Sequence, residues 1–448
     1  MSDWSEQHRL IEQLFTEGLT AVEPRSVVRR NLTYSDSSLS VSDRTLAVNG
    51  RLVVLAIGKA AGAMALGAID VLGNRIDLGI ALSKDDHFED DIPGFECYEA
   101  RHPLPDQRGI DATSRILQAC TGLTHSDTVI ALISGGGSAL LEAPASDISL
   151  KDFQQMTDLL LRAGAPIQHL NAVRSAISRV KGGGLRRAIG DATCVSLILS
   201  DVLGNDPSVI ASGPTVYSVP DVARASGLVD QYGITNSIPE SVRRVLASPP
   251  QELPHFDLSG DVWQIIADNR WLVESVRSSA TTLGLASDVI WTDVEGEARE
   301  LGVQFVRSAN AMGPEIDLVL GGGEATVKVT GSGTGGRNTE FALAAAIELS
   351  KDGPPDWVVA SIGTDGQDGS ADAAGAIADP DSVQRARSIG LSASDFLREN
   401  DSAGFFGAIE GLVRTGPTGT NVNDLYVAVR RRRSTRSSQS TGERFPGR

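Results

Sequence analysis

Short apolar runs alternate along the chain with longer segments that have helical periodicity. Each apolar run has the length of a buried strand, and glycine, serine or aspartate turns follow several of them. The runs lie at residues 51–58, 78–83, 128–134, 194–200, 262–268, 316–323 and 357–366. Strands that alternate with helices predict a mostly parallel sheet with helices on both faces. The pattern therefore indicates an α/β protein.

The length and one interruption of the pattern predict two domains. A chain of 448 residues exceeds the size of one ordinary domain. Proline and polar residues gather at residues 247–260, which is typical of a linker. We expect a first domain over residues 1–250 and a second over residues 251–429, and we expect the first residues of the chain to form an amphipathic helix rather than a signal peptide.

Charge and cysteine usage limit the possible partners and compartments. The net charge is −17, and residues 430–448 carry seven arginines and one glutamate, so residues 1–429 carry −23. An acidic body with only six lysines argues against nucleic acid as its partner and suits concentrated salt. Residues 430–448 read as a basic, disordered tail. Three scattered cysteines and no apolar run of membrane-spanning length predict a cytoplasmic protein.

Polar and glycine-rich clusters follow five of the predicted strands. They lie at residues 58–59, 134–138, 200–201, 321–324 and 363–368. The carboxyl ends of the strands in an open α/β sheet form the ligand crevice. We therefore expect a binding site built from these clusters.

Two of the clusters suit phosphate. Lys59 follows a strand and begins a helix, although the P-loop pattern of nucleotide-binding proteins is absent. The run Ser134, Gly135, Gly136, Gly137, Ser138 can present successive amides to an anion. The alternatives are a solvated lysine and a flexible turn.

A predicted helix carries Asn171, Arg174, Ser178 and Lys181 on one face, since they are spaced by three or four residues. Arg174 and Lys181 are candidates for binding phosphate. The alternative is a solvated helix face that ends at a glycine cap.

Acidic residues offer a base or a metal site. Asp201 follows a buried strand, and Asp206 lies five residues further on. Carboxylates near phosphate suit Mg²⁺ binding or general-base catalysis, and the alternative is turn formation and helix capping. Asp365 follows another strand, but its surroundings lack the full calcium-loop pattern, and we reject that interpretation.

The segment from Val319 to Ala346 is rich in glycine and places Arg337 at the start of a helix. We expect its first glycines to let a ligand approach the backbone. We expect the later ones to form a mobile lid that closes Arg337 onto a phosphoryl group, because the guanidinium offers a rigid fork of donors.

Five segments resemble the glycerate 2-kinase family, whose C-terminal part is known as the MOFRL domain: "ISGGGSALLEAP", "LSDVLGNDPSVIASGPT", "LGGGEATVKVTGSGTGGRNTEFALAAA", "GTDGQDGSADAAGA" and "TNVNDLYV". "RHPLPDQRG" is similar to a further segment of the family, and the resemblance spans about residues 5–429. It implies two α/β domains with a cleft between them. The first would be a doubly wound Rossmann-like sheet, and the second a mixed α/β domain with the MOFRL segment at about residues 315–429.

The resemblance also implies the chemistry. A member phosphorylates D-glycerate at its 2-hydroxyl with ATP and Mg²⁺, giving 2-phosphoglycerate and ADP. It implies catalytic roles for Lys59, Asp201 and Arg337, with Asp201 and Asp206 as possible metal ligands. The candidates for binding substrate or phosphate are Ser134, Gly135, Gly136, Gly137, Ser138, Arg174, Lys181, Gly322, Glu324, Asn338 and Asp365.

Two other functions compete with the kinase. Members are often labelled hydroxypyruvate reductase, which requires NAD(P)H, but no G-x-G-x-x-G opens a helix with an acidic residue about 20 positions on. A non-catalytic glycerate-binding regulator would not need a general base such as Asp201. The sequence allows a homo-oligomer and does not fix the oligomeric state.

Overall fold

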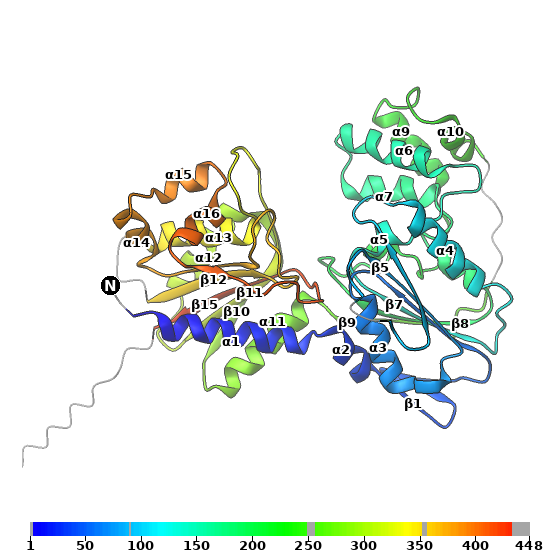
Figure 1. Ribbon diagram of the computed structural model, residues 1–448, viewed down its shortest axis with the longest axis horizontal. Helices are drawn as coiled ribbons and strands as arrows, with labels where there is room; N and C mark the ends of the chain where they lie inside the picture. The colour runs from blue at the N-terminus through cyan, green and yellow to red at the C-terminus, as the bar shows by residue number, and fades with distance from the viewer. Residues whose placement is uncertain (1–2, 89–90, 249–255, 352–355, 432–448) are drawn as a thin grey trace, which may run out of the picture.

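The computed structural model describes residues 3–88, 91–248, 256–351 and 356–431. Two lobes lie side by side, and each is built around a six-stranded sheet (Figure 1). The predicted α/β class with two α/β units is confirmed.

The first lobe contains a parallel sheet in the order β6-β5-β4-β7-β8-β9. Its strands are β4 (Leu52–Ile57), β5 (Leu78–Lys84), β6 (Phe95–Ala100), β7 (Thr128–Ile133), β8 (Thr193–Leu199) and β9 (Val262–Ala267). β4 and β7 are buried at every residue, which explains their continuous apolar sequences. The order runs outward in both directions from the β4–β7 pair, as in a doubly wound sheet. Ligands bind at such a switch point, beyond the carboxyl ends of the strands.

Helices and a small hairpin sheet complete this lobe. The helices are α2 (Pro24–Asn31), α3 (Ala61–Leu72), α4 (Gln107–Ala119), α5 (Gly137–Leu140), α6 (Leu150–Arg162), α7 (Ile167–Ala176), α8 (Gly184–Ile189), α9 (Val222–Gln231) and α10 (Glu240–Leu246). Two 3-10 turns are η1 (Gly73–Arg75) and η2 (Ile210–Ser212). The small hairpin sheet consists of three antiparallel strands, β1 (Leu32–Ser35), β2 (Ser38–Val41) and β3 (Arg44–Ala47).

The second lobe has a mixed sheet in the order β10-β11-β15-β12-β13-β14. Its strands are β10 (Ser287–Glu297), β11 (Leu318–Thr326), β12 (Trp357–Gly363), β13 (Gly375–Ala378), β14 (Leu412–Val413) and β15 (Asp424–Arg430). Only β10 and β11 pair in parallel among these described strands. The last strand, β15, inserts between β11 and β12, so the C-terminal segment lies at the centre of the sheet.

Helices cover both faces of the second sheet. One face packs against α1 (Ser5–Ala21) and α11 (Asn269–Thr282). The other packs against α12 (Ala298–Asn310) and α13 (Arg337–Leu349), with α14 (Ser382–Ser388), α15 (Ala393–Arg398) and α16 (Ser402–Ala408) nearby. The amphipathic N-terminal helix is confirmed, because α1 buries Ile11, Leu14 and Phe15 against this lobe.

The chain passes between the lobes twice. It leaves α1 in the second lobe and enters α2 in the first, and it returns at Asp268, between β9 and α11 (Figure 1). β9 therefore belongs to the first sheet although it lies beyond residue 250, where we expected the boundary. Of the predicted tail, Arg430 ends β15 and Arg431 lies over the ring of Trp4, and residues 432–448 lie outside the described residues. None of the described helices combines the length and apolarity that a membrane span requires.

Candidate active site

A pocket opens between the two lobes at the switch point of the first sheet. The first lobe lines it with Lys59, which follows β4, with Lys84, the last residue of β5, and with Ser134, which follows β7. The second lobe contributes Asp365, which follows β12, and residues 417–421, which precede β15. Segments that are far apart in sequence thus meet in one pocket, and its lining includes residues of three of the five predicted clusters, those at 58–59, 134–138 and 363–368.

The loops after β4 and β7 are held together by their backbones. Gly58 has a φ of +118°, and a Cβ at this position would overlap Ser134, so only glycine fits. The amide of Lys59 donates to the carbonyl of Gly135 at 2.9 Å, and the amide of Ala60 donates to Oγ of Ser134 at 3.1 Å. Lys59 is therefore placed beside the glycine-rich loop.

Asp201 follows β8 and lies against the same loop. A Cβ on Gly135 would overlap its carboxylate, so the missing side chain makes room for Asp201. The carboxylate accepts a hydrogen bond from Asn421 at 3.3 Å, across the pocket. Burial raises the pKa of Asp201, and the nearby ammonium of Lys59 opposes that rise. A carboxylate with a raised pKa is a stronger base than an exposed one.

The wall that the first lobe contributes carries the positive charges of Lys59 and Lys84. Burial and the charge of Lys59 lower the pKa of Lys84. Burial and the same charge lower the pKa of His102 to about 4, and burial and Lys84 lower that of His87. The lowered pKa values mean that a further positive charge is unfavourable in this wall. A bound anion would therefore stabilise the charged forms of the two lysines.

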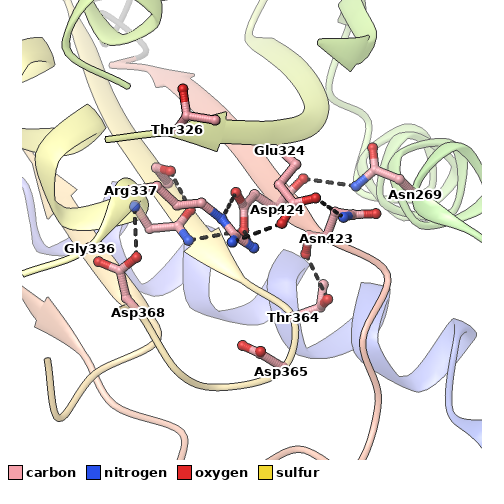
Figure 2. A network of polar contacts seen from close by, with 12 residues as sticks. Asn269, Glu324, Thr326, Gly336, Arg337, Thr364, Asp365, Asp368, Asn423 and Asp424 are labelled. Atoms are coloured by element: carbon pink, nitrogen blue, oxygen red, sulfur yellow. Dashed lines mark hydrogen bonds and ion pairs between the residues drawn. The ribbon is translucent and has the colours of Figure 1, made fainter. Parts of the chain in front are cut away.

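Arg337 begins α13 and lies in a network of carboxylates and amides (Figure 2). Its Nε donates to Asp424 at 2.6 Å and its Nη2 at 3.0 Å, and Nη1 lies 3.0 Å from Glu324. Although burial alone lowers the pKa of Arg337, the charges of Asp424 and Glu324 raise it above its usual value. All three guanidinium nitrogens thus have carboxylate partners.

The glycine-rich loop before Arg337 differs from the mobile lid that we expected. The amides of Thr330 and Gly331 donate to Asn400, and that of Thr334 donates to Asp401. Cβ atoms on Gly331, Gly333, Gly335 and Gly336 would overlap residues 368 and 399–402. These glycines allow close packing of a hydrogen-bonded loop, and the lid expectation is corrected on this ground.

Arg174 and Lys181 lie behind the glycine-rich loop of the first lobe rather than in the lining of the pocket. Nζ of Lys181 donates to the carbonyl of Ser138 at 2.5 Å and lies 3.3 Å from Glu142. Nη2 of Arg174 donates to the same carbonyl at 2.9 Å. Lys181 is 1% exposed, and burial lowers its pKa to about 8. Both cations support the loop from inside the lobe.

Other candidates lie in different settings. Gly322 lies inside β11, where a Cβ would overlap Asn269, so it serves packing. Asn338 is buried and donates to Asp424 at 3.0 Å. Asp206 is exposed and caps a turn by accepting from Ser208. The described residues contain no group of three or more metal-ligating side chains.

Sequence reasoning missed several residues of the site. Lys84 is the last residue of β5 and comes directly after the predicted run at 78–83, so the strand-end argument could have found it. The other missed residues lie either in segments that were quoted only for the family resemblance or, for His87, outside any quoted segment. They are His87, His102, Asn421, Asn423 and Asp424.

The fold and pocket define a two-lobed α/β protein with an anion-accepting site beside a partly buried carboxylate. Residues 317–424 match the MOFRL family, and residues 10–247 match a domain of unknown function (DUF4147). The chain belongs to the glycerate kinase family, as the following relatives establish.

The D-glycerate 2-kinase of Thermotoga maritima is 39% identical over 386 residues, which cover 85% of this chain and 90% of the relative. A putative hydroxypyruvate reductase of Agrobacterium vitis is 40% identical over 427 residues, covering 91% of this chain and 95% of the relative. The crystal structure of glycerate kinase from Thermotoga maritima matches with a TM-score of 0.84 at 35% identity, over 95% of this chain and all of that one.

Proposed function

We propose that the protein transfers a phosphoryl group from ATP to the 2-hydroxyl of D-glycerate, giving 2-phosphoglycerate and ADP. The observation that carries this proposal is the pocket in which Lys59 lies beside both the glycine-rich loop and the partly buried carboxylate of Asp201. Phosphoryl transfer depends mainly on positioning and electrostatic stabilisation, which this arrangement supplies. The family and its glycerate kinase relatives support the same reaction.

In this reaction Asp201 accepts the proton of the attacking hydroxyl. Its raised pKa suits that task, because general bases work best when their pKa approaches the working pH. Lys59 and Lys84 balance the negative charge of the transferring phosphoryl group and of the glycerate carboxylate. The predicted anion nest of residues 134–138 binds phosphate oxygens beside Lys59.

Mg²⁺ fits the donor set of the pocket. Proteins usually bind Mg²⁺ through one or two carboxylates together with substrate phosphates. Asp365 lines the pocket, and its charge adds to the rise that burial causes in the pKa of the nearby Asp201. Asp365 would hold the ion, which would neutralise charge on the phosphates, and Asp201 is a ligand only in the alternative in which it is not the base. Asp206 remains a predicted ligand only, because its carboxylate already caps a turn.

A reductase is the competing function, since one similar protein carries that name. In a dinucleotide-binding protein the turn between the first strand and helix is rich in glycine, so that its backbone can approach the pyrophosphate closely. The turn between β4 and α3 contains Lys59 instead. This difference favours the kinase.

Two assays run in parallel test the proposal. The purified protein is mixed with ATP, Mg²⁺ and D-glycerate, and ADP release is measured by a coupled assay while phosphorus NMR identifies the product. A second sample contains NADH and hydroxypyruvate and is followed by absorbance. We expect ADP and 2-phosphoglycerate. Formation of 3-phosphoglycerate alone, oxidation of NADH, or binding of glycerate without turnover would each refute the proposal and identify the alternative.

A further inference from the structure

The loop before β15 contains a buried asparagine that connects the two lobes. Nδ2 of Asn423 donates to the backbone carbonyl of Asp201 at 2.9 Å and to Oε2 of Glu324 at 3.1 Å. Asp201 belongs to the first lobe, whereas Glu324 lies in β11 of the second. Asn423 is 3% exposed, so both hydrogen bonds are shielded from water.

The same network continues to Arg337 (Figure 2). Oε1 of Glu324 lies 3.0 Å from Nη1 of Arg337, whose other nitrogens bind the fully buried Asp424. A continuous chain of contacts therefore runs from the backbone of Asp201 through Asn423 and Glu324 to Arg337. We call these four residues the inter-lobe bridge.

The backbone at Asn423 is fixed independently of its side chain. Its φ is +64°, a conformation that asparagine and glycine adopt more readily than most residues. Its carbonyl accepts hydrogen bonds from the amide of Thr364 at 3.1 Å and from the hydroxyl at 2.7 Å. The side-chain amide is thus presented to the first lobe from a rigid part of the second sheet.

We propose that Asn423 is a positioning residue, which sets the location of Asp201 relative to the second lobe through the inter-lobe bridge. This proposal rests on the proposed function. The pocket walls belong to two lobes, and a displacement of about 1 Å in a reacting group can cost a factor of about 10² in rate. In this arrangement Arg337 also acts on the placement of the base, through Glu324 and Asn423.

Asn423→Gly tests the bridge because glycine tolerates the positive φ and removes only the amide. We expect kcat for ADP release to fall by about 10- to 100-fold, while KM for ATP and for D-glycerate changes by less than about threefold. Asn423→Asp keeps the shape but turns an oxygen toward a carbonyl and a carboxylate, so its kcat should fall at least as far.

Asn400→Gly is the matched control. Asn400 has a φ of +53° and is 6% exposed, and its side chain bonds within the second lobe, donating to Glu340 at 2.8 Å and accepting from the amides of Thr330 and Gly331. Asn400→Gly should lower stability, but its kcat should fall much less than that of Asn423→Gly. A kcat of Asn423→Gly close to that of the wild type, or an equal loss in Asn400→Gly, would overturn the proposal.

Hydrogen exchange gives a readout that does not depend on turnover. In Asn423→Gly the peptides around residues 200–206 and 420–424 should exchange faster, while the central strands β4 and β7 keep their protection. Uniformly faster exchange would mean general destabilisation and would refute the bridge. If the wild type releases no ADP, the proposed function fails, whereas the exchange pattern still decides whether Asn423 couples the lobes.

Discussion

Arg337 is paired on all sides by residues that are distant in sequence. Asp424 lies 87 positions further along the chain, yet it receives two of the three guanidinium contacts. The bidentate pair is shorter and more directional than a single ammonium contact could be. The arginine is therefore required for its geometry as much as for its charge.

Arg337→Lys should lower both activity and stability. Lysine lacks the planar fork that binds Asp424 through two nitrogens, and Asp424 is 0% exposed, so part of a buried charge loses its partner. We expect the free energy of unfolding to fall by about 2 kcal/mol, below the ~3–5 kcal/mol for complete loss of a partner in a buried pair. We also expect kcat to fall by about 10²- to 10³-fold, with a smaller change in KM for ATP.

Urea unfolding and steady-state kinetics measure the two effects of Arg337→Lys. Arg307→Lys is the control, because Arg307 is exposed and pairs with Glu348 on the helix surface, where an ion pair contributes little. Equal free energies of unfolding in the two variants would show that the two-nitrogen contact of Arg337 with Asp424 does not stabilise the protein.

Asp201→Asn tests the base directly. The substitution keeps the shape of the side chain and removes its ability to accept the proton. We expect kcat to fall by about 10²- to 10⁴-fold. Near-normal turnover would reduce Asp201 to a turn residue, and recovery of activity at raised Mg²⁺ concentration would make it a metal ligand instead.

At the scale of elements, the start of α13 depends on close packing. Asp368 accepts hydrogen bonds at 2.8 Å from the amides of both Asn338 and Thr339, which caps the helix. Gly336 precedes the helix with extended backbone, and a Cβ there would overlap Asp368. Glycine is needed at this point because a side chain would displace the cap.

Gly336→Ala should therefore destabilise the second lobe. Overpacking of this kind costs about 1–3 kcal/mol in the free energy of unfolding, which urea titration can measure. Gly227→Ala provides the contrast, since Gly227 lies in α9 with nothing within 4 Å of a Cβ. That change should stabilise by about 0.5–1 kcal/mol. If both substitutions stabilise, the loop has room to rearrange and packing does not explain the glycine.

At the scale of the whole molecule, α1 joins the N-terminal segment to the second lobe. Nε2 of His8 lies 3.2 Å from Asp379, and Arg385 donates to the same carboxylate at 2.8 Å. Although burial alone raises the pKa of Asp379, the hydrogen bonds from His8 and Arg385 lower it to about 2. The ionised carboxylate thus connects the first helix to a distant part of the chain.

This arrangement predicts a pH-dependent contribution to stability. The folded pKa lies below the ordinary value of 3.8, so the contribution is present above about pH 4 and is lost as the pH falls toward 2. Asp379→Asn should lower the free energy of unfolding by about 2 kcal/mol at pH 5–7. Urea unfolding of both proteins should show that the difference shrinks below pH 4. If the difference in the free energy of unfolding stays constant down to pH 3, the pKa of Asp379 is not lowered in the way described.

The sequence by itself determined five of the six strands of the first sheet, all but β6, and the residues that follow several of them. Buried parallel strands need continuous apolar runs, and the turns after them need glycine or short polar residues, so both signals are local. The predicted runs at 51–58, 128–134 and 194–200 correspond to β4, β7 and β8. Lys59 and Asp201 were found for that reason, because parallel strands bring their carboxyl ends to one edge.

Only the tertiary structure decided what the second lobe contributes. Its central strand β15 comes last in the chain and pairs with two strands that precede it by long intervals, which no local pattern encodes. The partner of Arg337, the place of Asn423 beside Asp201 and the packing role of the glycine-rich loop all follow from that pairing. A side chain's type can be read from the sequence, but its partners depend on which distant segments the fold brings together.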